Sequence, residues 1–248
     1  MDDRSGLRRR TASNTWQSVE TLEERTRVAK AKPHVVFVHG TFAEGSDRGT
    51  GYAAPDQEFP TMLREHFGVG GDSHGTSYGT FGWSGSATEH ARQKAGTRLA
   101  GWITDWRKAN PDRPLHLVGH SHGGNVIGHA LGALDESLSV DSVMMLGTPH
   151  WDPSHNPSWN RKSAARVSGE ILTAFSTNDR VQVEGATAAN AADLGAPTPY
   201  RIQRTLSASA LGHPRVSNAD STRLIHAAEH HSALHDTDAF AAIRKKVD

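Results

Sequence analysis

The sequence predicts an α/β fold with a mostly parallel central sheet and helices on both faces. From residue 33 onward, short apolar runs alternate with longer segments in which apolar residues recur every three or four positions. The run at 34–38 is apolar on both faces, as expected of a strand covered by helices on both sides. The run at 115–118 turns sharply into a helix pattern. A chain of 248 residues is long enough for one such domain.

The composition excludes several classes of function. Lys and Arg together number 27, as do Asp and Glu, so we expect no nucleic-acid partner. The absence of cysteine rules out a disulfide framework, a thiolate metal site and a cysteine nucleophile. No stretch approaches the roughly 20 apolar residues of a transmembrane segment. The composition leaves the oligomeric state open.

Residues 1–32 are predicted to be an N-terminal tail with a possible polar helix at 16–30, and residues 33–248 a single catalytic domain. The three arginines at 8–10 precede polar residues, where a signal peptide would need an apolar core. We therefore expect a cytoplasmic protein, with signal-independent export left open.

The first strand, 34–38, ends in His39-Gly40-Thr41 and leads into a glycine-rich loop. A short helix is predicted at 55–67, a strand at 76–83 and a long amphipathic helix from 91 to 106, which Asn110-Pro111 ends. The apolar stripe of that long helix is interpreted as core.

The strand at 115–118 is followed by Gly119-x-Ser121-x-Gly123, the spacing of a nucleophile elbow. A serine in so tight a turn has a strained backbone, and the residues two before and two after it must lack a bulky side chain. The next helix opens with free N–H groups aimed at the serine, which suits attack on a carbonyl.

Further strands are predicted at 140–146, 170–176 and 222–227, and a helix at the end of the chain. The irregular segment 151–163 is interpreted as the rim of an acyl pocket. Residues 185–220 are rich in Ala, Gly, Pro and Ser, and we interpret them as a lid-like excursion.

A serine nucleophile needs a base and a carboxylate that orients the base. Asp179 follows a predicted strand beyond the elbow and is the candidate acid, although an aspartate at Asn178-Asp179 could also simply stabilise a turn. His231 is the favoured base because it lies in a loop past the last strand, with His230 and His235 as alternatives.

Metal and cofactor sites are not expected. His150, Asp152 and His155 could form a metal cluster, but they are interpreted as solvated loop residues. His231 and His235 are four residues apart, a metal-pair spacing, yet the glutamate of the zinc-peptidase pattern is missing between them. For the oxyanion, the backbone N–H groups of Thr41 and His122 are the candidate donors.

Several motifs together give the sequence a recognisable resemblance. They are Val38-His39-Gly40-Thr41-Phe42, Trp83-Ser84-Gly85, the Gly-His-Ser-His-Gly-Gly-Asn elbow, Leu146-Gly147-Thr148-Pro149, Asn178-Asp179-Arg180-Val181-Gln182 and His231-Ser232-Ala233-Leu234-His235.

With these motifs, residues 33–247 resemble the lipase/esterase branch of the α/β-hydrolase superfamily, and more narrowly signal-less bacterial hydrolases that include antibacterial lipase effectors. The resemblance implies the α/β-hydrolase fold and a triad of Ser121, Asp179 and His231, with Thr41 and His122 at the oxyanion hole. The function expected is hydrolysis of a small-molecule or lipid carboxylic ester through an acyl-enzyme, without a cofactor. Two alternatives stay open: a lipase or phospholipase, which could act as a toxin, and a non-catalytic binding protein on a hydrolase fold.

Overall fold

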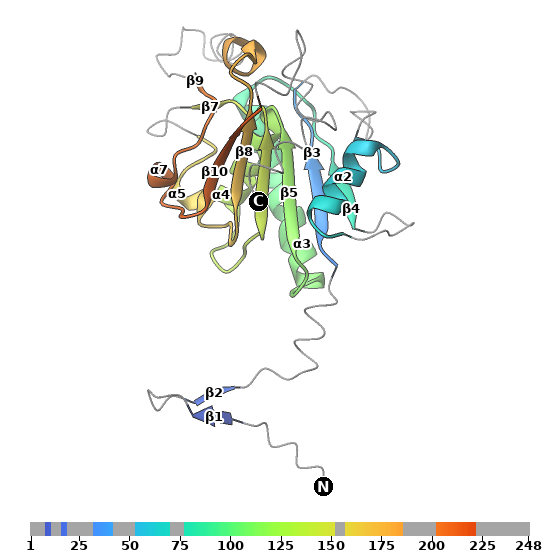
Figure 1. The fold of residues 1–248 in the computed structure, drawn as a ribbon, viewed down its shortest axis with the longest axis vertical. Helices are drawn as coiled ribbons and strands as arrows, with labels where there is room; N and C mark the ends of the chain where they lie inside the picture. The colour runs from blue at the N-terminus through green and yellow to red at the C-terminus, as the bar shows by residue number, and fades with distance from the viewer. Residues whose placement is uncertain are drawn as a thin grey trace.

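A six-stranded parallel sheet forms the centre of the molecule (Figure 1). The computed structural model describes residues 8–10, 16–18, 32–41, 53–69, 77–151, 157–185 and 202–221. Across the sheet the strands are ordered β10-β8-β6-β5-β3-β4, and every neighbouring pair is parallel. Their bounds are β3 His34–Val38, β4 Tyr78–Phe81, β5 Leu115–His120, β6 Ser142–Leu146, β8 Ile171–Phe175 and β10 Val216–Asp220.

Helices cover both faces of this sheet, as predicted. The long helices α3 (Glu89–Ala109) and α4 (His122–Ala133) pack on one face, and α2 (Glu58–His66) packs on the other. The described residues also form the short helices α5 (Arg161–Ala164) and α7 (Ala208–Leu211) and a π-helical turn, η2 (Val181–Gly185). None of the described helices is long and apolar enough to cross a membrane.

The alternation of side chains along each strand divides the core into two clusters. In β3, Val36 and Val38 join the cluster beneath α3 and α4, whereas Val35 and Phe37 join the cluster beneath α2. The same division runs through β5 and β6. Because strands such as β3 are buried on both faces, their sequences are almost continuously apolar.

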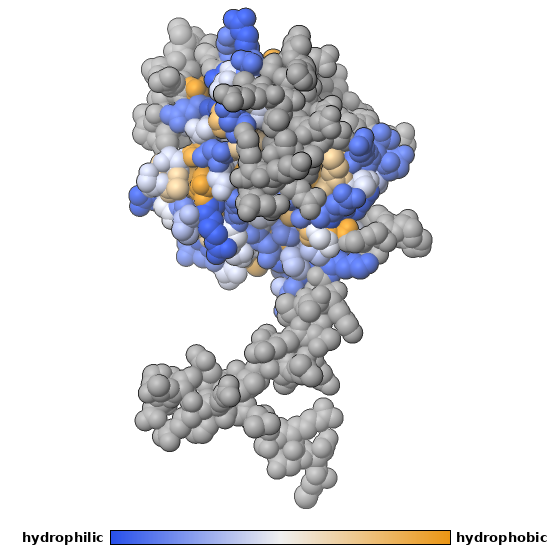
Figure 2. All heavy atoms as spheres, viewed as in Figure 1, coloured by the Kyte–Doolittle hydropathy of each residue, from blue (hydrophilic) through white to orange (hydrophobic). Residues whose placement is uncertain are grey.

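The described surface is mainly hydrophilic on the face shown in Figure 2, with small separate hydrophobic areas. Among the described residues, Val181 is the large apolar side chain that stands out as exposed, with an exposed fraction of 58%. It lies in η2, two residues after Asp179.

Two expectations are corrected at the ends of the described chain. Trp16–Ser18 forms the strand β2, paired antiparallel with β1 (Arg8–Arg10), where the sequence suggested the start of a helix. A segment without an apolar face gains little from being helical, so short-range pairing can replace it. The rest of the expected helix, 19–30, lies outside the described residues.

The second correction concerns the excursion expected at 185–220. Its last five residues form β10, an outer strand of the described sheet that pairs with β8, and not part of a lid. Only Ala219 of this strand is buried, so β10 lacks the apolar run by which the inner strands are recognised. The strand expected at 222–227 and the final helix lie outside the described residues.

Candidate active site

The sharp turn predicted around Ser121 is present. β5 ends at His120, α4 begins at His122, and Ser121 between them has φ 52° and ψ −132°. Among the described residues, Ser121 is the non-glycine residue with a positive φ. Such a conformation is strained for a residue with a side chain and is typical of functional sites. A backbone hydrogen bond of 2.8 Å from Ser121 N–H to Leu146 O fastens the turn to the end of β6.

The two glycines that flank the serine are required by close packing. A Cβ atom at Gly119 would lie 2.5 Å from the backbone nitrogen of Gly124, inside the turn itself. A Cβ atom at Gly123 would lie 2.1 Å from the carbonyl oxygen of Val38, at the end of β3. Both distances are far below contact distance, so the elbow spacing reflects real steric limits.

The exit of β3 lies directly against the serine. A Cβ atom at Gly40 would lie 2.7 Å from the Cβ and 3.4 Å from the Oγ of Ser121. β3 and β5 are neighbours, but the chain continues from β3 to one side of the sheet and from β5 to the other. Crevices at the carboxyl ends of strands at such a switch point are where open α/β sheets bind ligands.

His39 holds the exit of β3 in place. Its Nδ1 contacts the carbonyl oxygen of Gly40 at 2.8 Å, and its Nε2 receives the backbone N–H of Trp83 at 3.2 Å. A carbonyl can only accept and an N–H can only donate, so the ring is neutral with the proton on Nδ1. Burial lowers the pKa of His39, which favours the same neutral form. The indole of Trp83 stacks on the ring and donates to His39 O at 2.8 Å.

The side chain of His122, the residue after the serine, is fixed by Asn125. The Nδ2 of Asn125 donates to Pro149 O at 3.1 Å and lies 3.0 Å from the Nδ1 of His122. Because a carbonyl only accepts, this amide orientation makes the His122 Nδ1 an acceptor. Ser158 completes the arrangement by donating to the Oδ1 of Asn125. The roles of Asn125 and Ser158 could not be recognised from sequence spacing.

Asp179 lies where the sequence places it, four residues after the end of β8, and its exposed fraction is 1%. Its Oδ1 accepts the backbone N–H of Gln182 at 2.8 Å, and its own N–H donates to Ser176 O. These contacts are those of a turn-stabilising aspartate. Asp179 and Ser121 both follow strands of one parallel sheet and therefore lie at the same edge.

The three candidate bases, His230, His231 and His235, lie outside the described residues, as do Asp152 and His155. Thr41 is described and follows Gly40 directly. His150 is fully buried in the short strand β7 (His150–Trp151), not solvated as the sequence suggested. The described residues contain no group of three His, Cys, Asp or Glu side chains that could hold a metal ion.

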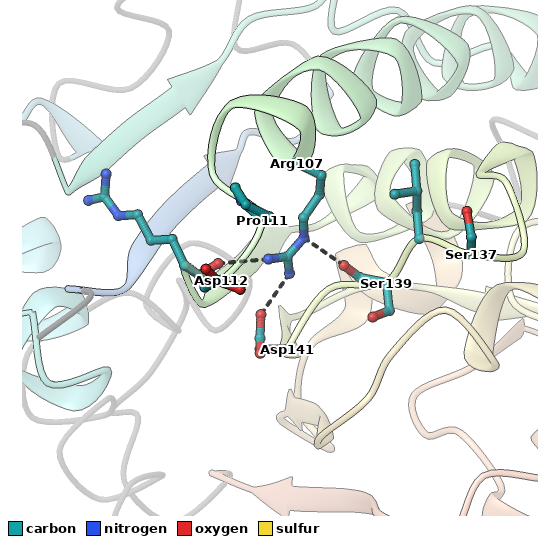
Figure 3. Close-up of a pocket in the computed structure, with 8 residues that line it drawn as sticks. Arg107, Pro111, Asp112, Ser137, Ser139 and Asp141 are labelled. Carbon is teal, nitrogen blue, oxygen red and sulfur yellow. Dashed lines mark hydrogen bonds and ion pairs between the residues drawn. The ribbon is translucent and has the colours of Figure 1, made fainter. Parts of the chain in front are cut away.

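A surface pocket of about 340 Å³ lies at the opposite edge of the sheet (Figure 3). Its lining residues Arg113 and Asp141 lie two residues before β5 and one residue before β6, whereas Ser121 follows β5. The guanidinium of Arg107 donates to the carbonyl oxygens of Ser139 and Arg113 and pairs with Asp141 at 2.7 Å. The pocket is therefore separate from the elbow. The guanidinium of Arg107 is already bound by these three groups of the protein.

Known proteins resemble parts of this chain. GPI inositol-deacylase from Candida albicans is 39% identical over 57 residues, which are 23% of this chain and 15% of that protein. Cutinase from Trichoderma reesei is 20% identical, with 66% of this chain and 74% of the cutinase covered and a TM-score of 0.41. Dienelactone hydrolase from Anabaena variabilis is 17% identical, with 88% and 85% covered and a TM-score of 0.44.

A match to a family model identifies the family of this chain, which the pairwise similarities do not. Residues 33–183 match the family described as alpha/beta hydrolase fold. This range begins just before β3 and includes the elbow, Asp179 and most of η2. The chain belongs to the alpha/beta hydrolase fold family.

Proposed function

We propose that this protein is a serine hydrolase that cleaves carboxylic esters through an acyl-enzyme intermediate. The observation that carries the proposal is the strained backbone of Ser121, at φ 52°, between β5 and the first turn of α4. The chain at Gly40 packs directly against this serine. A serine at the start of a helix, with a second loop packed against it, is a setting in which backbone N–H groups can bind a tetrahedral oxyanion.

The proposed mechanism has two halves. The Oγ of Ser121 attacks the ester carbonyl carbon while His231 takes the hydroxyl proton, and Asp179 orients His231. The N–H groups of Thr41 and His122 bind the oxyanion. The C–O bond to the alcohol then breaks, and the alcohol leaves with the proton from His231. A water molecule, deprotonated by His231, attacks the acyl group, and the acid is released as Ser121 regains its proton.

The positions of the strands support this assignment. Two strand spacings separate β5 from β8, about 10 Å, which leaves room for one imidazole between Ser121 and Asp179. His231 is ten residues beyond Ser221, the residue that follows β10, and ten residues can span about 30 Å. We infer that residues 33–248 make up the catalytic domain and that its last part supplies the base.

The test is labelling with a fluorophosphonate probe together with hydrolysis of p-nitrophenyl esters. The wild type is expected to react with the probe, whereas Ser121→Ala loses labelling and at least about 1,000-fold of its kcat. Ser137→Ala, at an exposed serine, serves as the matched control and keeps both. Single replacement of His230, His231 and His235 by alanine identifies the base.

A folded wild type that neither reacts with the probe nor hydrolyses any ester would contradict this proposal and favour a binding protein on a hydrolase fold. Hydrolysis at the wild-type rate by Ser121→Ala would contradict the choice of nucleophile.

A lipid ester is the second candidate substrate. The local similarity to a protein named GPI inositol-deacylase favours it, because that name describes removal of an acyl group from a lipid. The same assay, extended to phospholipids and to esters of graded chain length, separates the two. A rate that rises when the substrate forms micelles supports a lipase, and equal rates on micelles and monomers support an esterase.

A further inference from the structure

The turn that carries Asp179 has a backbone carbonyl group at each of its two ends. β8 ends at Phe175, and the turn from Ser176 to Asp179 is closed by a hydrogen bond of 3.1 Å from Asp179 N–H to Ser176 O. The carbonyl oxygens of Ser176 and Asp179 are the first and last of this turn. Any group that binds both fixes the turn from end to end.

Arg204 binds both of these oxygens. Its Nε donates to Ser176 O at 3.0 Å, and its Nη2 donates to Asp179 O at 3.0 Å. Hydrogen bonds from a charged donor are stronger than neutral ones, and a planar guanidinium with two donors fixes direction as well as distance. Arg204 comes from a segment 25 residues farther along the chain than Asp179.

The segment 202–206 that carries Arg204, here called the return segment, is itself held at two points. Its first two residues form β9 (Ile202–Gln203), which pairs antiparallel with β7 beside the elbow. At its other end, Leu206 exchanges two hydrogen bonds, of 3.1 Å and 3.0 Å, with the side chain of Asn218 in β10. The arginine therefore extends from a firmly attached piece of backbone.

A second contact fixes the same turn from the other side. The buried side chain of Gln182 donates to Thr148 O at 2.6 Å, and its backbone N–H donates to Asp179 Oδ1. Thr148 lies two residues after the end of β6. The carboxylate of Asp179 is thus held against β6 by Gln182, and its main chain against the return segment by Arg204.

From this geometry we infer that Arg204 is a positioning residue for the catalytic acid: it holds the turn so that the carboxylate of Asp179 meets the base in one orientation. The inference rests on the proposed function. It assigns a catalytic contribution to the region that the sequence alone suggested to be a lid.

The experiment is a double-mutant cycle between Arg204→Ala and Asp179→Asn, measured as kcat and KM for an activated ester. Alone, Arg204→Ala is expected to lower kcat by about 10- to 100-fold with KM within about twofold, because only the orientation of the triad is lost. In the Asp179→Asn background the same change is expected to cost less than about threefold, since residues that act through one another are not additive.

Two further variants control for folding. Arg161→Ala removes an exposed arginine that also donates to a backbone carbonyl, that of Ala210, and is expected to keep the wild-type kcat. Arg204→Lys keeps the charge but not the planar pair of donors, so its kcat is expected between those of the wild type and Arg204→Ala. Thermal melting of each variant accompanies the kinetics.

Equal losses from Arg204→Ala in both backgrounds would overturn the inference and leave a merely structural role for Arg204. So would a wild-type kcat in Arg204→Ala. If Ser121→Ala is inactive in the same assays, either result leaves the proposed function in place. A fully active Asp179→Asn would instead show that Asp179 is not the acid, and it would overturn the inference about Arg204 as well. If Arg204→Ala does not fold, the cycle is run with Arg204→Lys, and the same comparison decides.

Discussion

His39 connects two segments that meet at Ser121, because its ring donates to Gly40 O and accepts from Trp83 N–H. The described residues contain no cis peptide bond, so the carbonyl of Gly40 and the N–H of Thr41 point in opposite directions from one rigid plane. By holding the carbonyl, His39 sets the direction of the N–H that we propose as an oxyanion donor. The proton on Nδ1 is required for this, which gives a physical role to the neutral ring.

Replacing His39 with leucine is therefore expected to lower kcat by about 10- to 100-fold, in the range that loss of an oxyanion donor costs, while KM changes little. Asparagine carries an amide nitrogen near the position of Nδ1, and His39→Asn is expected to recover part of the loss. Steady-state kinetics on a p-nitrophenyl ester, with melting temperatures as a folding control, provide the measurement. An unchanged kcat in His39→Leu, or a change confined to KM, would argue against this role.

The site residues that could be predicted from the sequence are those that belong to a short motif with a characteristic spacing. Ser121 and its two glycines belong to one short motif, and the steric reason for the glycines is present in the structure. Asn125, Gln182 and Arg204 could not be identified in this way, because each acts on a residue or carbonyl that only the folded chain brings near. Hydrogen bonds between distant segments leave no periodic pattern in a sequence.

At the scale of elements, the position of α4 against β3 depends on how closely the two backbones approach. Gly123, in the first turn of α4, lies against the carbonyl oxygens of Val38 and His39. The same helix also contains Gly132, whose ideal Cβ position has no atom within 4 Å. Among the glycines of α4, Gly123 is thus required by packing and Gly132 is not.

We expect Gly123→Ala to destabilise the protein by more than about 3 kcal/mol, because the new methyl group would overlap backbone atoms that cannot move without shifting β3. Gly132→Ala is expected to stabilise it by about 0.5–1 kcal/mol, since alanine loses less conformational entropy in a helix. Urea unfolding monitored by circular dichroism measures both. Similar effects of the two substitutions would show that the approach of α4 to β3 is not limited by this contact.

Among the elements, the inner strands, the outer strand β4 and the helices α2, α3 and α4 were predictable, whereas the outer strand β10 and the short pieces β7, β9, α5 and α7 were not. β3, β5, β6 and β8 lie close to their predicted ranges because two-sided burial makes their sequences apolar. β10 has one buried side chain, and its two apolar residues, Val216 and Ala219, are separated by polar ones, so no apolar run marks it. Its place is set by pairing with β8, a tertiary contact.

Over the whole molecule, several ionisable groups are buried in states that acid would disturb. Burial lowers the pKa of His150 to about 3, and it lowers the pKa of His116 to about 4 although Asp141 opposes it. For Glu89, burial alone would raise the pKa, but the hydrogen bond and charge of His129, together with Arg92, lower it to about 2. All three shifts favour uptake of protons by the unfolded chain, so acid destabilises the fold.

His150 offers the clearest test, because it is fully buried and neither of its ring nitrogens has a hydrogen-bond partner in the part of the chain that the structure describes. Above pH 6.5 the ring is neutral in the folded and the unfolded chain, and it adds no pH dependence. Between pH 6.5 and about 3, the unfolded chain binds a proton at this ring and the folded chain does not, so stability falls by up to about 1.4 kcal/mol per pH unit.

We therefore expect His150→Phe to lose this part of the pH dependence. The free energy of unfolding is measured with urea at pH 7.5, 6.5, 5.8 and 5.0. Between pH 7.5 and pH 5.0, the wild type should lose about 1–2 kcal/mol more of it than the variant. This range ends before Glu89 contributes strongly. Ile202→Val, at a buried residue paired with the neighbouring Trp151, serves as the control. It should lower the free energy of unfolding by a similar amount at every pH.

Parallel curves for the wild type and His150→Phe would mean that the ring takes up a proton in the folded protein. In that case the interior around β7 must admit water, because a charged imidazole without a partner is not stable in a dry core.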